Sequence, residues 1–187
     1  MKKLLMIPLV AMLSFGGKAP ETHTFQSDGF ETISLEVINV PAPTTLPTSI
    51  DIVLSCASQY GGWIENTGSN IAVYDFLFSS DVTLGTWEAN FQTAQMTNIL
   101  WTGGLLPFDG VIDFAGNSGD GGWHPVEQYP NLIVLTLTAP EDIAHFMKRD
   151  PAILLDFVHS VSYSTNGSAY TVRRWIESYQ GSITYNY

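Results

Sequence analysis

Three aspartates lie within a glycine-rich stretch, FDGVIDFAGNSGDGGWH, which spans residues 108–124. Ca²⁺ prefers several carboxylate and carbonyl oxygens presented by a bent loop, so Asp109, Asp113 and Asp120 are candidate ligands of such an ion. The spacing does not fit an EF-hand, because Asp109 and Asp113 are four residues apart and no Glu follows at the twelfth position.

The same stretch also fits a strand flanked by turns. Asp109-Gly110 is typical of a tight turn, and Asp109, Val111 and Asp113 would share one face of the strand that follows. The two aspartates would then stand about 13 Å apart, too far to share one ion without a bulge. A calcium site therefore requires the loop 117–123 to bring Asp120 back toward Asp113.

Trp123 is the candidate ligand-binding residue, because a glycine-rich loop buries a side chain less completely than a sheet does. The chain has five Trp and eight Tyr, and aromatic faces stack against sugar rings, so a carbohydrate-binding module is one alternative. Aromatic side chains also fill the cores of sandwiches. Two or more coplanar, exposed rings on one sheet face would favour the carbohydrate-binding alternative.

The sequence gives little support for catalytic groups, and we predict neither a catalytic residue nor a cofactor. Cys56, the only cysteine, lies in an apolar segment and is predicted to be buried. The histidines lack short metal-binding spacing, and His145 and His159 are predicted to be surface or capped groups. A glycoside hydrolase, a weaker alternative, needs two carboxylates across a cleft. Its candidates, most of which fit solvent-facing strand positions, are Glu65, Glu88, Asp109 and Asp113.

The elements that must position these residues are predicted to be strands. Apolar and polar residues alternate with a period of two in many segments, among them 31–40, 49–56, 61–66, 110–116 and 152–161. Roughly ten short strands separated by turn residues predict an all-β fold, an antiparallel, jelly-roll-like β-sandwich. One short helix is predicted near 140–148, where Pro140 precedes two acidic residues. Asn166-Gly167-Ser168 predicts a hairpin turn.

Residues 1–19 have the features of a secretory signal peptide, with Lys2 and Lys3 before an apolar run of about a dozen residues. Residues 20–29 are predicted to be an N-terminal arm, free to pair with a neighbour, and 30–187 a single domain. The net charge of −11 disfavours nucleic acid and anionic membranes as partners. We therefore expect a secreted or cell-surface protein without a membrane span after signal cleavage.

Four segments occur in the order typical of the bacterial choice-of-anchor E domain family. They are GWIENTGSN (62–70), FDGVIDFAGNSG (108–119), PEDIAHFMKRDPAILLDF (140–157) and GSITYNY (181–187). Over residues 25–187 the chain resembles this family, although 148–151 replace its usual glycine-rich turn and no C-terminal sorting tail follows. The resemblance implies an exported surface or matrix β-sandwich without known catalytic residues. The sequence thus predicts a non-catalytic structural or interaction protein that can self-associate or bind other surface polymers.

Overall fold

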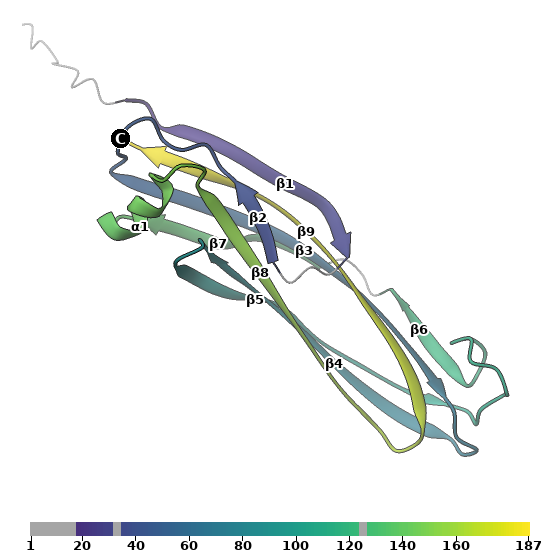
Figure 1. Ribbon diagram of the computed structural model, residues 1–187. Coiled ribbons are helices and arrows are strands. Elements are labelled where there is room, and N and C mark those ends of the chain that lie inside the picture. The colour runs from purple at the N-terminus through teal and green to yellow at the C-terminus, as the bar shows by residue number, and fades with distance from the viewer. Residues whose placement is uncertain (1–17, 32–34, 124–126) are drawn as a thin grey trace, which may run out of the picture.

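The computed structural model describes residues 18–31, 35–123 and 127–187. These residues form an all-β sandwich with one short helix, as predicted, and Figure 1 shows its elongated shape. The elements are β1 (Glu21–Glu31), β2 (Leu35–Asn39), β3 (Ser49–Asn66), β4 (Ala72–Gly85), β5 (Asn90–Leu105), β6 (Gly119–Trp123), β7 (Glu127–Leu137), α1 (Pro140–Phe146), β8 (Ala152–Thr165) and β9 (Ala169–Asn186).

The strands form two antiparallel sheets. Sheet A has the order β1-β9-β3, and the other edge of β3 pairs with β7 over Ile50–Ser58 and with β6 over Gly61–Glu65. Strands β6 and β7 therefore lie end to end and act as one interrupted strand. Sheet B has the order β2-β8-β4-β5.

The pairing follows the rule of a jelly roll, in which one long antiparallel hairpin is rolled into two sheets. Strand β1 pairs with β9, β2 with β8, β3 with β6 and β7, and β4 with β5. Contacts of β9 with β3 and of β8 with β4 close the roll. The strand order of the chain itself thus confirms the predicted fold class.

Several predicted short strands are parts of longer ones. Residues 61–66 continue β3, and the final segment GSITYNY belongs to β9. The Asn166-Gly167-Ser168 turn joins β8 to β9, as predicted. The strand expected at 110–116 is absent, because residues 106–118 form an irregular loop.

The interior has two hydrophobic clusters separated by polar side chains. One cluster, mostly aliphatic, contains Ile50, Ile52 and Leu54, whereas the other is mostly aromatic and contains Tyr60, Phe76 and Phe78. Between them each of four strands contributes one inward polar residue, and we call this set the polar layer: Ser58 of β3, Ser80 of β4, His159 of β8 and Glu177 of β9.

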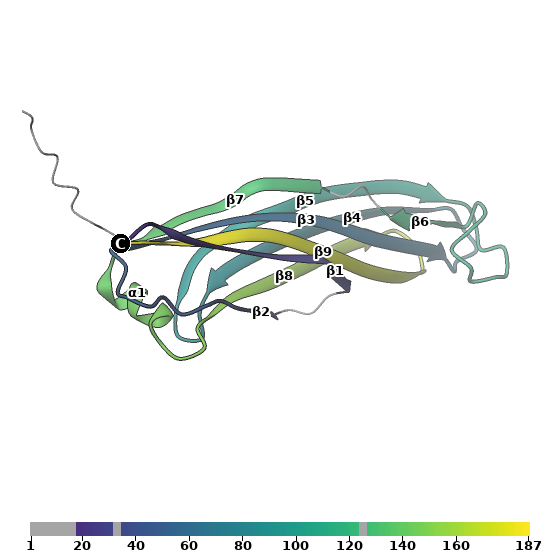
Figure 2. The ribbon, with the colours of Figure 1, turned by 90° about the horizontal axis from the view of Figure 1, so that it is seen from above.

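The helix and the 106–118 loop lie at opposite ends of the sandwich (Figures 1 and 2). Helix α1 begins at Pro140 and buries Ile143 and Phe146 against the aliphatic cluster, while Met147 caps its C-terminus and is exposed. No helix in the described ranges is long and apolar enough to cross a membrane.

The N-terminal segment differs from its prediction. Residues 21–31 are not a free arm, because they form β1 and pair with β9 of the same chain from Glu21↔Tyr185 to Glu31↔Ile176. Phe25 lies over Gly181 of β9, where an added Cβ would come within 2.5 Å of its ring. The predicted leader, apart from Lys18 and Ala19, lies outside the described residues.

Cys56 is buried, as predicted, and its burial gives a testable result. Burial, with a smaller contribution from the charge of Glu177, raises the pKa of the thiol to about 12. Because the thiolate is the reactive form, we expect iodoacetamide at about pH 8.5 to leave Cys56 unmodified in the native protein. The same reagent in guanidinium chloride should modify Cys56 completely. Mass spectrometry measures the extent of modification in the native and in the unfolded protein. Rapid modification of the native protein would contradict this prediction.

Candidate functional site

Two of the candidate calcium ligands bind their own loop. Asp109 Oδ1 accepts a hydrogen bond from the backbone N–H of Val111 (3.0 Å), and Asp113 Oδ1 accepts one from that of Ala115 (2.9 Å). Each is an Asx turn, in which a short polar side chain satisfies the backbone in place of a strand partner. These turns explain why residues 110–116 do not form the expected strand.

The third aspartate, Asp120, contacts a residue outside the loop. Asp120 of β6 accepts a hydrogen bond from the Tyr74 hydroxyl of β4. Burial and this hydrogen bond raise the pKa of Tyr74 above its ordinary value. Among the residues that the structure describes, no group of three His, Cys, Asp or Glu side chains could hold a metal ion.

Glu65 is not solvent-facing, because the 106–118 loop covers it on the outer face of sheet A. Its side chain is fully buried, and Oε2 accepts a hydrogen bond from the backbone N–H of Phe114 (2.8 Å). Phe114 has φ of 56°, a left-handed conformation that is rare for a large side chain. Glu65 therefore anchors the loop at its most strained residue.

The two other carboxylate candidates, Glu88 and Asp113, are both exposed. Glu88 is exposed, and a hydrogen bond from Lys148 lowers the pKa of its carboxyl group. His145 Nδ1 of α1 lies 3.1 Å from Glu88 Oε2. Asp113 remains exposed in the loop.

Trp123 packs against a second tryptophan on the outer face of sheet A. Its ring centroid lies 5.5 Å from that of Trp63, with an angle of 88° between the ring planes. Because the rings are perpendicular, they do not form the coplanar pair expected of a flat sugar platform. The neighbouring His124 lies outside the described residues.

Of the two alternatives predicted for His159, a surface group is wrong, because its side chain is buried and capped by a carboxylate. His159 lies in the polar layer, where its Nε2 is 2.8 Å from Glu177 Oε1 and its ring stacks on Trp175 at 4.4 Å. The Ser58 hydroxyl donates to the same Glu177 oxygen (2.9 Å). Glu177 is fully buried, and its other oxygen, Oε2, has no hydrogen-bond partner among the described residues.

These contacts differ from those of a catalytic triad. In a triad the histidine lies between the acid and the nucleophile, whereas Ser58 and His159 both contact Glu177. The two buried glutamates, Glu65 and Glu177, are seven residue pairs apart along the β3–β9 ladder, about 24 Å. That distance is far beyond the separation used by glycoside hydrolases.

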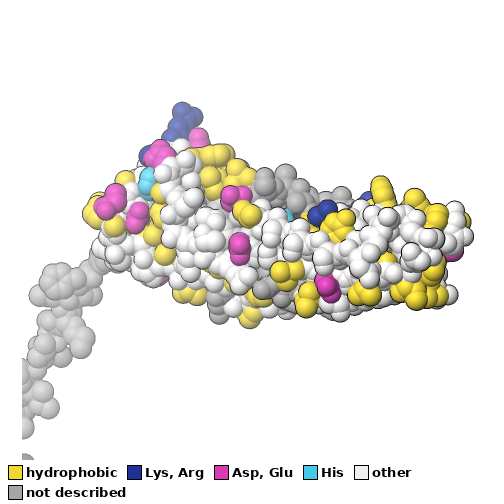
Figure 3. Space-filling model, turned by 90° about the horizontal axis from the view of Figure 1, so that it is seen from below, with side chains coloured by type: hydrophobic (Ala, Val, Ile, Leu, Met, Phe, Trp, Pro, Cys, Tyr) yellow, Lys and Arg dark blue, Asp and Glu magenta, His cyan; other side chains and the backbone are white. Residues whose placement is uncertain are grey.

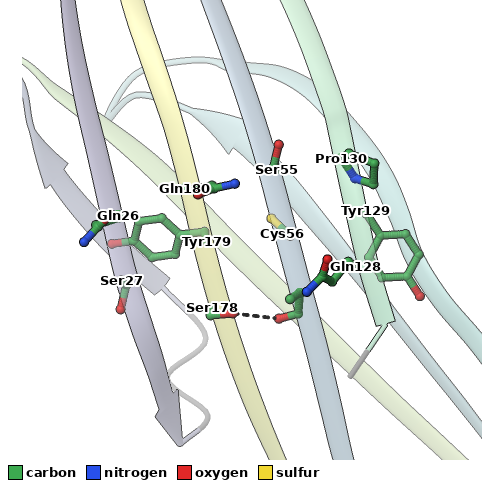
Figure 4. A pocket seen from close by; sticks show the side chains of 11 residues that line it. Gln26, Ser27, Ser55, Cys56, Gln128, Tyr129, Pro130, Ser178, Tyr179 and Gln180 are labelled. Atoms are coloured by element: carbon green, nitrogen blue, oxygen red, sulfur yellow. Dashed lines mark hydrogen bonds between the residues drawn. The ribbon is translucent and has the colours of Figure 1, made fainter. Parts of the chain in front are cut away.

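An open groove of about 420 Å³ lies on the outer face of sheet A (Figure 4). It crosses β1, β9, β3 and β7, and residues 130–132 of β7 bulge opposite Ser55. The described residues of its lining include no Asp, Glu, Lys, Arg or His; they are Gln26, Ser27, Ser55, Cys56, Ala57, Gln128, Tyr129, Pro130, Ser178, Tyr179 and Gln180. The sequence analysis did not single out these glutamines, because outward Gln and Ser residues are common on any exposed sheet.

Comparison with known proteins gives only distant structural similarity. No family model and no curated protein matches the chain, so the resemblance to the choice-of-anchor E family stays a prediction. The chain is similar to the structure of infectious bursal disease virus Gx strain, with 13% identity, a TM-score of 0.31 and coverage of 91% of this chain and 33% of that one. It is also similar to the VP2 subviral particle of the same virus, with 13% identity, a TM-score of 0.26 and coverage of 98% and 38%. The chain thus spans about a third of the length of these viral chains.

Proposed function

We propose that the protein is an exported, non-catalytic structural or interaction protein of the cell exterior, and that it self-associates through the free edge of β5. The non-catalytic part is supported by the carboxylates and histidines described above. Asp109, Asp113 and Glu65 hold a loop, and His159 and Glu177 pair inside the sandwich. None of these groups lines the groove of sheet A.

The observation that carries self-association is the composition of β5. This strand lies at the edge of sheet B and has sixteen residues, NFQTAQMTNILWTGGL, with no charged residue, histidine or proline. An edge strand offers backbone N–H and C=O groups to another chain, and natural proteins usually protect such an edge with charges, prolines or short length. A long edge without these features favours association.

The other sheet edges carry the protection that β5 lacks. Strand β1 contains Glu21, β2 is only five residues long and contains Glu36, and β7 contains Pro130. The chain has a net charge of −11, so two copies repel each other wherever acidic groups meet. Figure 3 shows one face of the molecule, on which charged side chains gather toward one end and are few along the rest.

The second half of β5 has the regular geometry that strand pairing needs. Bulges interrupt its pairing with β4 between Ser80 and Asp81 and between Leu84 and Gly85, but residues 97–105 pair continuously with 72–80. A second copy related by a two-fold axis can add its own β5 antiparallel to this segment and extend sheet B across both copies.

Analytical ultracentrifugation of two lysine variants tests this proposal. Leu100 faces outward on β5 and is 64% exposed, and its partner Leu77 faces outward on β4, one strand further from the edge. We expect the unmodified protein to be dimeric at micromolar concentration and Leu100→Lys to be monomeric, because a charge on the edge strand blocks pairing. Leu77→Lys, the matched control, should remain dimeric.

Two outcomes would contradict edge pairing. If the unmodified protein is monomeric, the proposal of self-association is wrong. Equal loss of the dimer in Leu77→Lys and Leu100→Lys would show that the outer face of sheet B, rather than its edge, forms the contact.

A further inference from the structure

The groove on sheet A has a floor of short side chains between longer ones. Ser55 and Ala57 of β3 and Ser178 of β9 form the floor, and Figure 4 shows Ser178 beside β3, where its hydroxyl donates to the carbonyl of Ala57. Gln26 of β1 and Gln128 of β7 stand on the two flanking strands. The hollow is therefore built by side-chain size across four adjacent strands.

Three glutamine amides of the groove are available to a ligand. Within the described part of the chain, the amide groups of Gln26, Gln128 and Gln180 make no side-chain hydrogen bond. Each amide offers two donors and one acceptor oxygen, a combination that matches neighbouring hydroxyl groups, which both donate and accept. The Tyr129 ring lies on the opposite face of the sheet, because Tyr129 pairs with Cys56 and packs against the aliphatic cluster.

The charges in and around the groove limit the classes of ligand that it can bind. Among the residues whose side chains the structure describes, the lining has no carboxylate to attract a cation and no basic group to hold an anion, and the net charge of −11 repels anions from the whole molecule. The floor is a sheet face, whose backbone groups are used within the sheet, so an extended peptide cannot bind there by strand addition. Cations, anions and extended peptides are thus disfavoured, whereas a neutral ligand rich in hydroxyl groups fits the groove.

We propose that this groove binds a neutral glycan. The site is distinct from the β5 edge, because it lies on the other sheet and none of its lining residues belongs to β5. The amide side chains of Gln26, Gln128 and Gln180 hold the sugar hydroxyls. Carbohydrate recognition thus rests on these residues and not on the perpendicular pair Trp63 and Trp123.

Affinity electrophoresis in native gels tests the proposal. The gels contain one soluble neutral polysaccharide each, namely mixed-linkage β-glucan, xyloglucan, galactomannan or dextran, and a parallel gel contains anionic polygalacturonate. We expect at least one neutral polysaccharide, and not polygalacturonate, to retard the full chain. Gln180→Ala should weaken retardation about threefold to tenfold, the range for one lost hydrogen bond, and Gln128→Ala/Gln180→Ala should weaken it further.

Three further variants make the result specific. Ala57→Phe fills the floor of the groove and should abolish binding, whereas Gln95→Ala, an exposed glutamine on the outer face of sheet B, should bind normally. Leu100→Lys should also bind, which separates glycan binding from self-association. The proposal is overturned if no neutral polysaccharide retards the protein, if polygalacturonate does so equally, or if the groove variants behave like Gln95→Ala.

Discussion

Replacing His159 with Phe is expected to lower the free energy of unfolding by about 2–4 kcal/mol, because it leaves a buried carboxyl group with one partner fewer. Glu177 is fully buried, and Oε1 contacts His159 and Ser58. Phe retains a flat ring that can stack on Trp175, as His159 does at 4.4 Å. The variant therefore removes the hydrogen bond more than the packing. Urea denaturation followed by tryptophan fluorescence measures the change.

A double variant separates this explanation from simple misfit of the larger ring. In His159→Phe/Glu177→Leu both members of the pair are replaced by apolar side chains, and such a replacement is often close to neutral. We expect the double variant to be more stable than His159→Phe alone. If the double variant is the less stable of the two, the cost lies in packing and our account of the polar layer is wrong.

Truncation of Phe78 to Ala is expected to cost about 3–5 kcal/mol, the usual range for a buried aromatic side chain. Phe78 has no exposed surface and lies at the centre of the aromatic cluster. Its ring stacks on Tyr60 at 4.0 Å and on Phe76 at 5.6 Å, and meets Trp175 edge-on at 5.8 Å. Little nearby can move to fill the cavity, because these partners are themselves rings packed against one another.

The residue next to Phe78 provides the control. Leu77 faces outward from the same strand and is 42% exposed, so Leu77→Ala should cost less than about 1 kcal/mol in the same thermal or urea unfolding assay. Similar losses for the two variants would mean that the alternation of inward and outward residues along β4 is not as we describe.

Local patterns in the sequence predicted most of the strands. The period-two alternation in 49–56 and 152–161 corresponds to parts of β3 and β8 because one face of each strand is buried. Pro140 and the acidic residues after it predicted the start of α1, since helix initiation depends on neighbouring residues. The 166–168 turn is equally local, as the hairpin between β8 and β9 shows.

Contacts between distant residues could not be predicted in this way. His159 occupies an inward position of β8, but only the packing of sheet B on sheet A brings it to Glu177 of β9. Glu65 occupies an outward position of β3, where alternation predicts exposure, and the loop that buries it comes from residues 106–118. In that loop the Asx turns of Asp109 and Asp113 outweigh the apparent strand pattern.

The groove could not be predicted from the sequence either. Gln26, Gln180 and Ser55 form one row across β1, β9 and β3, while Gln128, Ala57 and Ser178 form the next row across β7, β3 and β9. These residues come from four separate segments of the chain, and the hollow depends on the register of the strands. A pattern of outward glutamines in strands identifies such residues only after the pairing is known.

The place of β9 in sheet A has a consequence for how the chain is made. β9 lies between β1 and β3, yet it is synthesised after all the other described strands. Sheet A is thus split until the ribosome has produced β9, and contacts between residues so far apart in sequence form slowly. We therefore expect native structure to arise only after β9 has emerged, so that the nascent chain stays open for longer than that of a protein whose neighbouring strands pair in order.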